Sequence, residues 1–94
     1  MKNEIKLRFI SNSELGIPTQ TKIAIDDRRA YYIIKNIKSR IIMKDGKKIL
    51  EIAKKIKTQK KTDVFLATTA PICSKTREHL KENKIETIFD YTVS

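Results

Sequence analysis

Residues 46–60 carry the strongest periodic pattern in the chain. Their apolar residues recur at i, i+3, i+4 and i+7, which places them in one stripe along an amphipathic helix. The apolar run at 64–67, Val-Phe-Leu-Ala, is typical of a strand that is buried on both faces. A helix with an apolar stripe followed by such a strand predicts a sheet covered by helices, in an α/β or α+β domain. The stripe consists of Ile49, Ile52, Ala53 and Ile56.

The residues around this pair extend the same alternation. Ser74 is expected to cap a helix over about 75–83, and residues 85–91 are expected to form the last strand. Strand, helix and strand then make a βαβ unit with parallel strands and a right-handed crossover. Residues 40–44 are interpreted as a buried strand that precedes a cap at Asp45. They could also continue an earlier helix, with Gly46 after its end.

The first part of the chain predicts a hairpin followed by a helix. Residues 4–10 alternate polar and apolar side chains, and 21–25 form a second short strand after a loop over 11–20. Asp26 or Asp27 is a good N-cap for a helix over about 27–38. The apolar residues that suggest this helix are Ala30, Ile33, Ile34, Ile37 and Ile41.

The chain has 94 residues, which suits one small domain. We therefore expect a single domain over 1–94, with an N-terminal β-hairpin at 1–26 and alternating helices and strands over 27–94. The expected sheet is mixed, with three to five strands and about three flanking helices.

Several kinds of site and location are excluded or disfavoured. One cysteine, Cys73, and one histidine, His79, cannot supply a Cys-rich zinc site or a two-histidine metal motif. There is no Gly-rich phosphate loop and no arrangement of Ser, His and Asp that predicts catalysis, so no catalytic residue, metal or cofactor is assigned. No apolar run reaches the roughly 18 residues of a membrane span, and the N-terminus lacks a signal core. The expected location is the cytoplasm.

Positive charge is concentrated in one segment of the chain. The whole chain has 21 Lys and Arg against 11 Asp and Glu, for a net charge of +10. Residues 35–61 alone carry a net charge of +9, from eleven bases and two acids. This clustering on a helix and its flanks favours a polyanionic partner, although a solvated helix face or a lysine-rich composition would also produce it. The candidate phosphate contacts are Lys44, Lys47, Lys48, Lys54, Lys55, Lys57, Lys60 and Lys61.

Two further groups could contact an anion. Arg28 and Arg29 can bind phosphates, and the neighbouring tyrosines, Tyr31 and Tyr32, can stack on unpaired bases unless one packs in the core. The turn after the 64–67 strand lies at the carboxyl end of that strand, where ligands of open α/β sheets often bind. Its polar residues Thr68, Thr69 and Ser74 are a candidate anion site, with Cys73 beside them.

The central and C-terminal residues resemble two known families. The run from Gly46 through the strand and the turn at 67–71, Ala-Thr-Thr-Ala-Pro, is similar to the kink-turn RNA-binding ribosomal proteins, in which a glycine opens a basic helix. This resemblance implies RNA binding by Gly46 and the basic helix. The same region is similar to the nitrogenase iron–molybdenum cofactor-binding family, which implies an RNase-H-like sheet that ends in strand, helix and strand.

The functional hypothesis is therefore a small basic protein that binds nucleic acid, preferably RNA, in a ribonucleoprotein. The lysine-rich helix face would contact the phosphate backbone. The alternative is a structural or regulatory module that binds an acidic protein. A third hypothesis is an anion-binding or redox domain that uses the Thr68–Ser74 turn.

Overall fold

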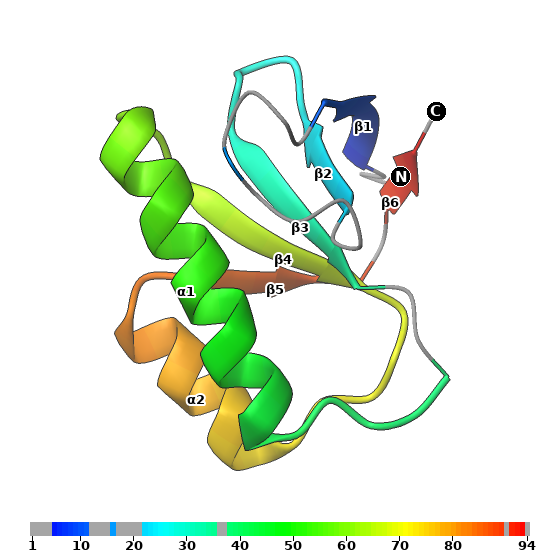
Figure 1. Ribbon diagram of the computed structural model, residues 1–94. Helices are drawn as coiled ribbons and strands as arrows, with labels where there is room; N and C mark the ends of the chain where they lie inside the picture. The colour runs from blue at the N-terminus through cyan, green and yellow to red at the C-terminus, as the bar shows by residue number, and fades with distance from the viewer. Residues whose placement is uncertain (1–4, 12–15, 17–21, 36–37, 90, 94) are drawn as a thin grey trace.

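The computed structural model describes residues 5–11, 16, 22–35, 38–89 and 91–93. Within them the chain forms six strands and two helices (Figure 1). The elements are β1 (Ile5–Ile10), β2 (Lys22–Ile25), β3 (Tyr31–Lys35), α1 (Met43–Gln59), β4 (Val64–Thr68), α2 (Ser74–Glu82), β5 (Glu86–Ile88) and β6 (Tyr91–Val93).

All six strands belong to one mixed sheet in the order β5-β4-β3-β2-β1-β6. The first three strands form an antiparallel meander, which confirms the N-terminal hairpin. Strands β3, β4 and β5 are parallel, and parallel neighbours need a crossover connection. Helix α1 connects β3 to β4 and α2 connects β4 to β5, so the expected βαβ unit is present and a second one precedes it.

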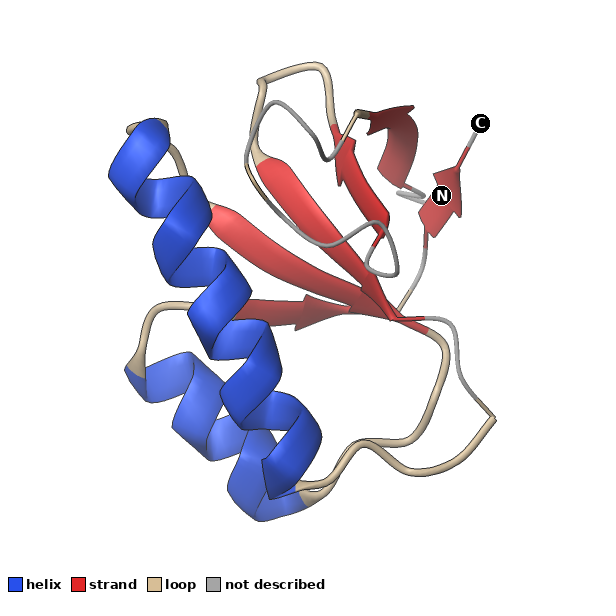
Figure 2. Ribbon diagram, in the orientation of Figure 1, coloured by secondary structure: helices blue, strands red, loops and turns tan. Residues whose placement is uncertain are grey.

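Both helices lie against the same face of the sheet (Figure 2). Their apolar stripes pack on Ile23, Ile33 and Leu66, which are all less than 2% exposed. The opposite face holds a second, smaller cluster of Leu7, Ala24, Tyr32, Ile34 and Ala67. The sheet is therefore apolar on both faces.

The prediction of a helix over 27–38 is wrong, because the described residues 27–35 form a tight turn and then β3. Ile37, which belongs to that predicted helix, lies outside the described residues. The carboxylate of Asp26 accepts hydrogen bonds from the backbone amides of Arg28 and Ala30, at 2.8 and 2.9 Å. It thus satisfies amides as an N-cap would, but it closes a turn in which Arg29 adopts a positive φ of 64°. Residues 31–34 are aromatic or β-branched, and Ile33 and Ile34 are buried on opposite faces of the sheet.

The segment 40–44 is also not the expected strand. Only Ile41 pairs, in an isolated parallel bridge with Ile72, and α1 begins at Met43. Asp45 lies in the first turn of α1, where its carboxylate accepts the amide hydrogen of Ile42 at 3.2 Å. The helix predicted over 46–60 is confirmed, with its start three residues earlier.

The single strand expected over 85–91 is two strands on opposite edges of the sheet. β5 pairs with β4, whereas β6 pairs with β1. Ile88 and Tyr91 are three residues apart, so their Cα atoms are separated by at most about 11 Å. The sheet must therefore curl until its two edges approach each other. The described residues form six strands and two helices, whereas three to five strands and about three helices were expected.

Candidate nucleic-acid interface

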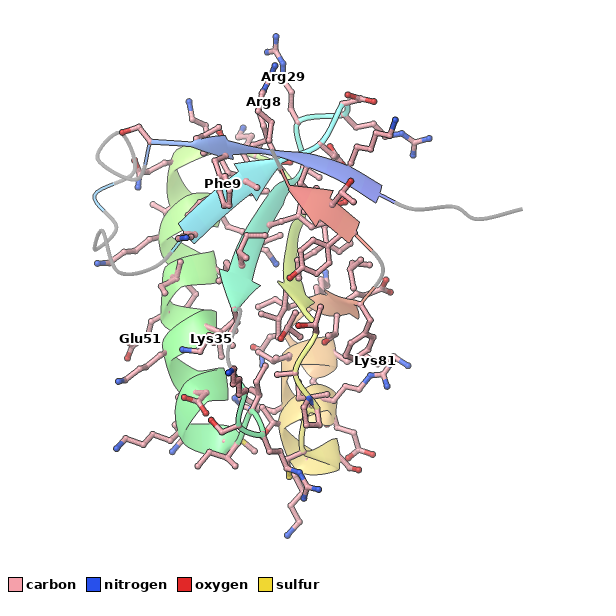
Figure 3. The ribbon with its side chains drawn as sticks, turned by 90° about the vertical axis from the view of Figure 1, so that its right-hand side faces the viewer. Arg8, Phe9, Arg29, Lys35, Glu51 and Lys81 are labelled. Carbon is pink, nitrogen blue, oxygen red and sulfur yellow. The ribbon has the colours of Figure 1, made fainter. Side chains whose placement is uncertain are left out.

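The solvent-exposed face of α1 is a lysine surface. Gly46, Ile49, Ala53 and Ile56 face the core. At about 100° per residue, the opposite side of the helix then consists of lysines around one acid, Glu51. Glu51 points away from the body of the protein (Figure 3). We call the exposed lysines the α1 lysine face; they are Lys44, Lys47, Lys48, Lys54 and Lys55.

These five ammonium groups are free to meet an external anion. In the part of the chain that the structure describes, none of them has a hydrogen-bond or ion-pair partner. Glu51 is three or four residues from four of the lysines, which is the spacing of helix-surface neighbours. One carboxylate among five lysines leaves this face with a net charge of +4.

The other three lysines predicted as contacts lie elsewhere. Lys57 is half-buried on the side of α1 that faces α2, and its Nζ donates to the carbonyl oxygen of Asn83 at 3.4 Å. Lys60 and Lys61 are exposed after the end of the helix. The lysines on the helix therefore divide into a free face and one tethered residue.

Arg28 and Arg29 are exposed in the β2–β3 turn, next to the end of α1. The hydroxyl of Thr62 donates to the carbonyl oxygen of Arg29 at 3.1 Å, which holds the turn against the segment after Lys60 and Lys61. Arg8, which sequence reasoning did not select, lies beside Arg29 in Figure 3 because β1 pairs it with Ile25. The sequence alone could not assign Arg8 to this site, because its position depends on the register between β1 and β2.

Acidic residues offset the charge at this end of the molecule. Asp26, Asp27 and Asp63 surround the same turn, and the negative end of the α1 dipole points toward it. The arginines are therefore brought close to Lys60 and Lys61, but in a setting of mixed charge.

Tyr32 does not present its ring to solvent. It is 3% exposed, and its ring stacks on Phe65 with 5.0 Å between centroids. Its hydroxyl donates to Asp26 at 2.9 Å. Burial, and then this hydrogen bond, raise the pKa of Tyr32 well above its ordinary value. The ring is part of the core and is not available for stacking on a base.

In the turn after β4, the Thr68 hydroxyl is bonded to backbone groups of the protein itself. Thr68 is fully buried, and its Oγ1 donates to the carbonyl oxygen of Lys35 at 2.6 Å and accepts from the amide of Ala70 at 3.0 Å. Thr69 and Ser74 are exposed. Ser74 is the first residue of α2, and the N-cap position belongs to Cys73 rather than to Ser74 as expected.

The described residues show neither a cluster of metal-binding side chains nor a helix that could span a membrane. Among residues 5–11, 16, 22–35, 38–89 and 91–93, no group of three or more His, Cys, Asp or Glu side chains could hold a metal ion. Neither described helix is both long and apolar enough to cross a membrane.

Comparisons with known proteins identify similar folds only. No protein-family model and no curated protein matches the chain. The fold is similar to part of a repair endonuclease from Pyrococcus abyssi, with a TM-score of 0.59 and 7% identity over 70% of this chain. It is also similar to part of EndoMS in a complex with dsDNA, with a TM-score of 0.59 and 9% identity over 77% of this chain.

The matched region covers 30% of each of those two chains, so this chain spans less than a third of their length. At this level of identity the likeness shows a shared fold. Neither matched structure is a kink-turn ribosomal protein or a nitrogenase cofactor-binding protein, and those two resemblances stay predictions.

Proposed function

We propose that this protein binds nucleic acid through the phosphate backbone, with the α1 lysine face as the main contact surface. The observation that carries the proposal is the set of five exposed lysines on one helix, for which the described residues supply no partner. Each lysine that contacts a phosphate displaces a condensed counterion, and this release adds affinity without reading the base sequence.

The fold likeness supports the same proposal. One matched structure is of a repair endonuclease, and the other is of EndoMS in a complex with dsDNA. This chain shares their fold and has the positive charge that a DNA or RNA backbone requires. Because both nucleic acids present the same phosphate chemistry, the test includes both.

The test measures the affinity of the full chain for labelled oligonucleotides by fluorescence anisotropy at about 50 mM salt. Its ligands are duplex DNA, duplex RNA and single-stranded RNA of equal length. In the test variant Lys47, Lys54 and Lys55 are all changed to Glu, which turns three attractive contacts into repulsive ones. We expect the parent to bind and this variant to lose at least about 100-fold in affinity, since a contact to a charged group contributes about 1.5–3 kcal/mol.

The control variant changes Lys6, Lys81 and Lys84 to Glu. These three residues are exposed and lie outside the α1 lysine face, so the net charge changes by the same amount. We expect the control to bind much better than the test variant. Equal losses in the two variants would show a general charge effect and contradict the proposed surface. Binding of polyglutamate as tightly as nucleic acid would favour an acidic protein as the partner and also contradict the proposal.

A further inference from the structure

The two helices begin side by side at one end of the molecule. The isolated bridge between Ile41 and Ile72 holds their leading segments together. The backbone amide of Ile41 donates to the carbonyl oxygen of Pro71 at 2.8 Å, and the backbone amide of Cys73 donates to the carbonyl oxygen of Ile41 at 2.9 Å. Figure 1 shows the two segments running next to each other into the first turns of α1 and α2. The positive ends of both helix dipoles therefore meet beyond the carboxyl ends of β3 and β4.

Exposed basic side chains surround these two helix starts. Lys38 and Arg40 come from the segment before α1, Lys44 from its first turn and Lys75 from the first turn of α2. The acids nearest in sequence are Asp45, which is half-buried and bonded to the amide of Ile42, and Glu78, one turn further along α2. The end with Arg28 and Arg29 has three aspartates and a negative helix end, so positive charge is less offset at the helix starts.

The pKa of the Cys73 thiol is consistent with positive electrostatic potential at the helix starts. Its thiol is partly exposed at the N-cap of α2. The pKa of the thiol lies below its ordinary value because the neighbouring backbone amides of Thr76 and Lys75 favour the thiolate, with Arg40 adding a favourable charge. The Thr76 side chain is fully buried, and its hydroxyl oxygen has no hydrogen-bond partner in the described structure.

We infer that this helix-start surface, formed by Lys38, Arg40, Lys44, Cys73 and Lys75, is a second phosphate-contact region of the nucleic-acid interface. Lys44 belongs to both regions, so one bound strand can continue from the α1 lysine face onto the helix starts. From Lys44 to Lys55 the helix rises about 16 Å, which leaves both regions within one short oligonucleotide. This inference rests on the proposed function.

The first experiment uses Cys73 as a probe of a bound duplex. The thiol is alkylated with uncharged iodoacetamide, with and without saturating duplex DNA. We expect the duplex to slow alkylation at least about five-fold. The control carries Cys73→Ser and Thr92→Cys, which moves the thiol to an exposed site on β6. Its alkylation should not change. Equal alkylation of Cys73 with and without the duplex would overturn the inference.

The second experiment neutralises charge at the helix starts. The variant with Lys38→Gln and Arg40→Gln should lose about two phosphate contacts, which makes the slope of log affinity against log salt about 1.8 less steep for a duplex. The matched control changes Lys81 and Lys84 to Gln and should keep the parent slope. Identical slopes in the two double variants would overturn the inference.

The outcomes separate this inference from the proposed function. If the parent binds no nucleic acid, both fail. If the Glu variant of Lys47, Lys54 and Lys55 loses binding while Cys73 stays unprotected and the Lys38/Arg40 variant equals its control, the helix-start contact alone fails.

A third measurement does not need nucleic acid. An anionic methanethiosulfonate should modify Cys73 faster than a cationic one, and the Lys38/Arg40 variant should reduce this preference.

Discussion

Gly46 sets how closely the two helices approach. A Cβ atom built on this residue would lie 2.6 Å from Cγ2 of Thr76, and Thr76 is fully buried. Such a distance is far below van der Waals contact, so one of the two helices or the Thr76 side chain would have to move. The absence of a side chain at this buried helix position is therefore a packing requirement.

We predict that Gly46→Ala lowers the free energy of unfolding by about 1–2 kcal/mol. Overpacking a buried site costs about 1–3 kcal/mol, and the better helix propensity of Ala returns up to about 1 kcal/mol. Urea unfolding followed by circular dichroism measures the difference. Lys47→Ala, at the next and exposed position, should stay within about 0.5 kcal/mol of the parent. Adding Thr76→Ser to Gly46→Ala removes the clashing methyl group and should recover part of the loss. An unchanged or increased stability of Gly46→Ala would contradict the close approach.

Tyr32 links stability to alkaline pH. Burial and the Asp26 carboxylate raise the pKa of Tyr32, so the folded protein keeps this proton at a pH where the unfolded chain has lost it. The resulting stability is fully present below the ordinary tyrosine pKa of about 10 and is lost as the pH rises above it, by up to about 1.4 kcal/mol per pH unit.

The test of this prediction compares unfolding of the parent and Tyr32→Phe between about pH 9 and 11. The free energy of unfolding of Tyr32→Phe should fall less steeply with pH than that of the parent. The difference in slope should approach the value for one proton, about 1.4 kcal/mol per pH unit. Burial also raises the pKa of Tyr91, but that contribution is common to both proteins. Parallel declines in the two proteins would show that Tyr32 does not hold its proton more tightly in the folded state.

Residue types alone predicted some side-chain positions but not others. The exposure of Lys47, Lys54 and Lys55 follows from the helical period, because each lies opposite the apolar stripe. The burial of Tyr32 does not follow, since a tyrosine beside two arginines fits a base-stacking site equally well. Its position is decided by the ring of Phe65 and the carboxylate of Asp26, which only the folded chain brings to it.

At the scale of one element, α1 offers an internal comparison of two isoleucines. Ile56 is fully buried, whereas Ile52 is half-buried at the border of the stripe. We predict that Ile56→Ala lowers the free energy of unfolding by about 2–5 kcal/mol. Ile52→Ala should cost roughly half of that or less, because much of its surface is already in water. Equal losses, measured by chemical unfolding, would mean that the helix is rotated from the orientation described.

Long periodic segments were predicted best. The sequence pattern over 46–60 fits only a helix, and the pattern over 64–67 fits only a buried strand. The error over 27–38 arises because Tyr31–Lys35 is buried on both faces, and its continuous apolar residues fit a helical period as well as a strand. The bridge at Ile41 is too short to have a period of its own, so the sequence does not distinguish it from a strand.

At the scale of the whole molecule, strand order could not be predicted. Residues 85–91 look like one strand, yet β5 (Glu86–Ile88) and β6 (Tyr91–Val93) lie at opposite edges of a curled sheet. The helix-start surface has the same origin, because Arg40 and Lys75 come together only through the pairing of Ile41 with Ile72. The α1 lysine face lies within one helix and could be predicted, whereas this second surface depends on tertiary structure.

The measurement that tests the central claim most directly is the affinity for duplex DNA across a salt series, for the parent and the variant with Lys47, Lys54 and Lys55 changed to Glu. Three to five lysine contacts predict a linear fall of log affinity with log salt, with a slope of about −2.7 to −4.5. The variant should bind weakly with a slope closer to zero by about 2.7 or more, while it unfolds at the same urea concentration as the parent. A folded variant that binds with the parent's affinity and slope would contradict binding through α1.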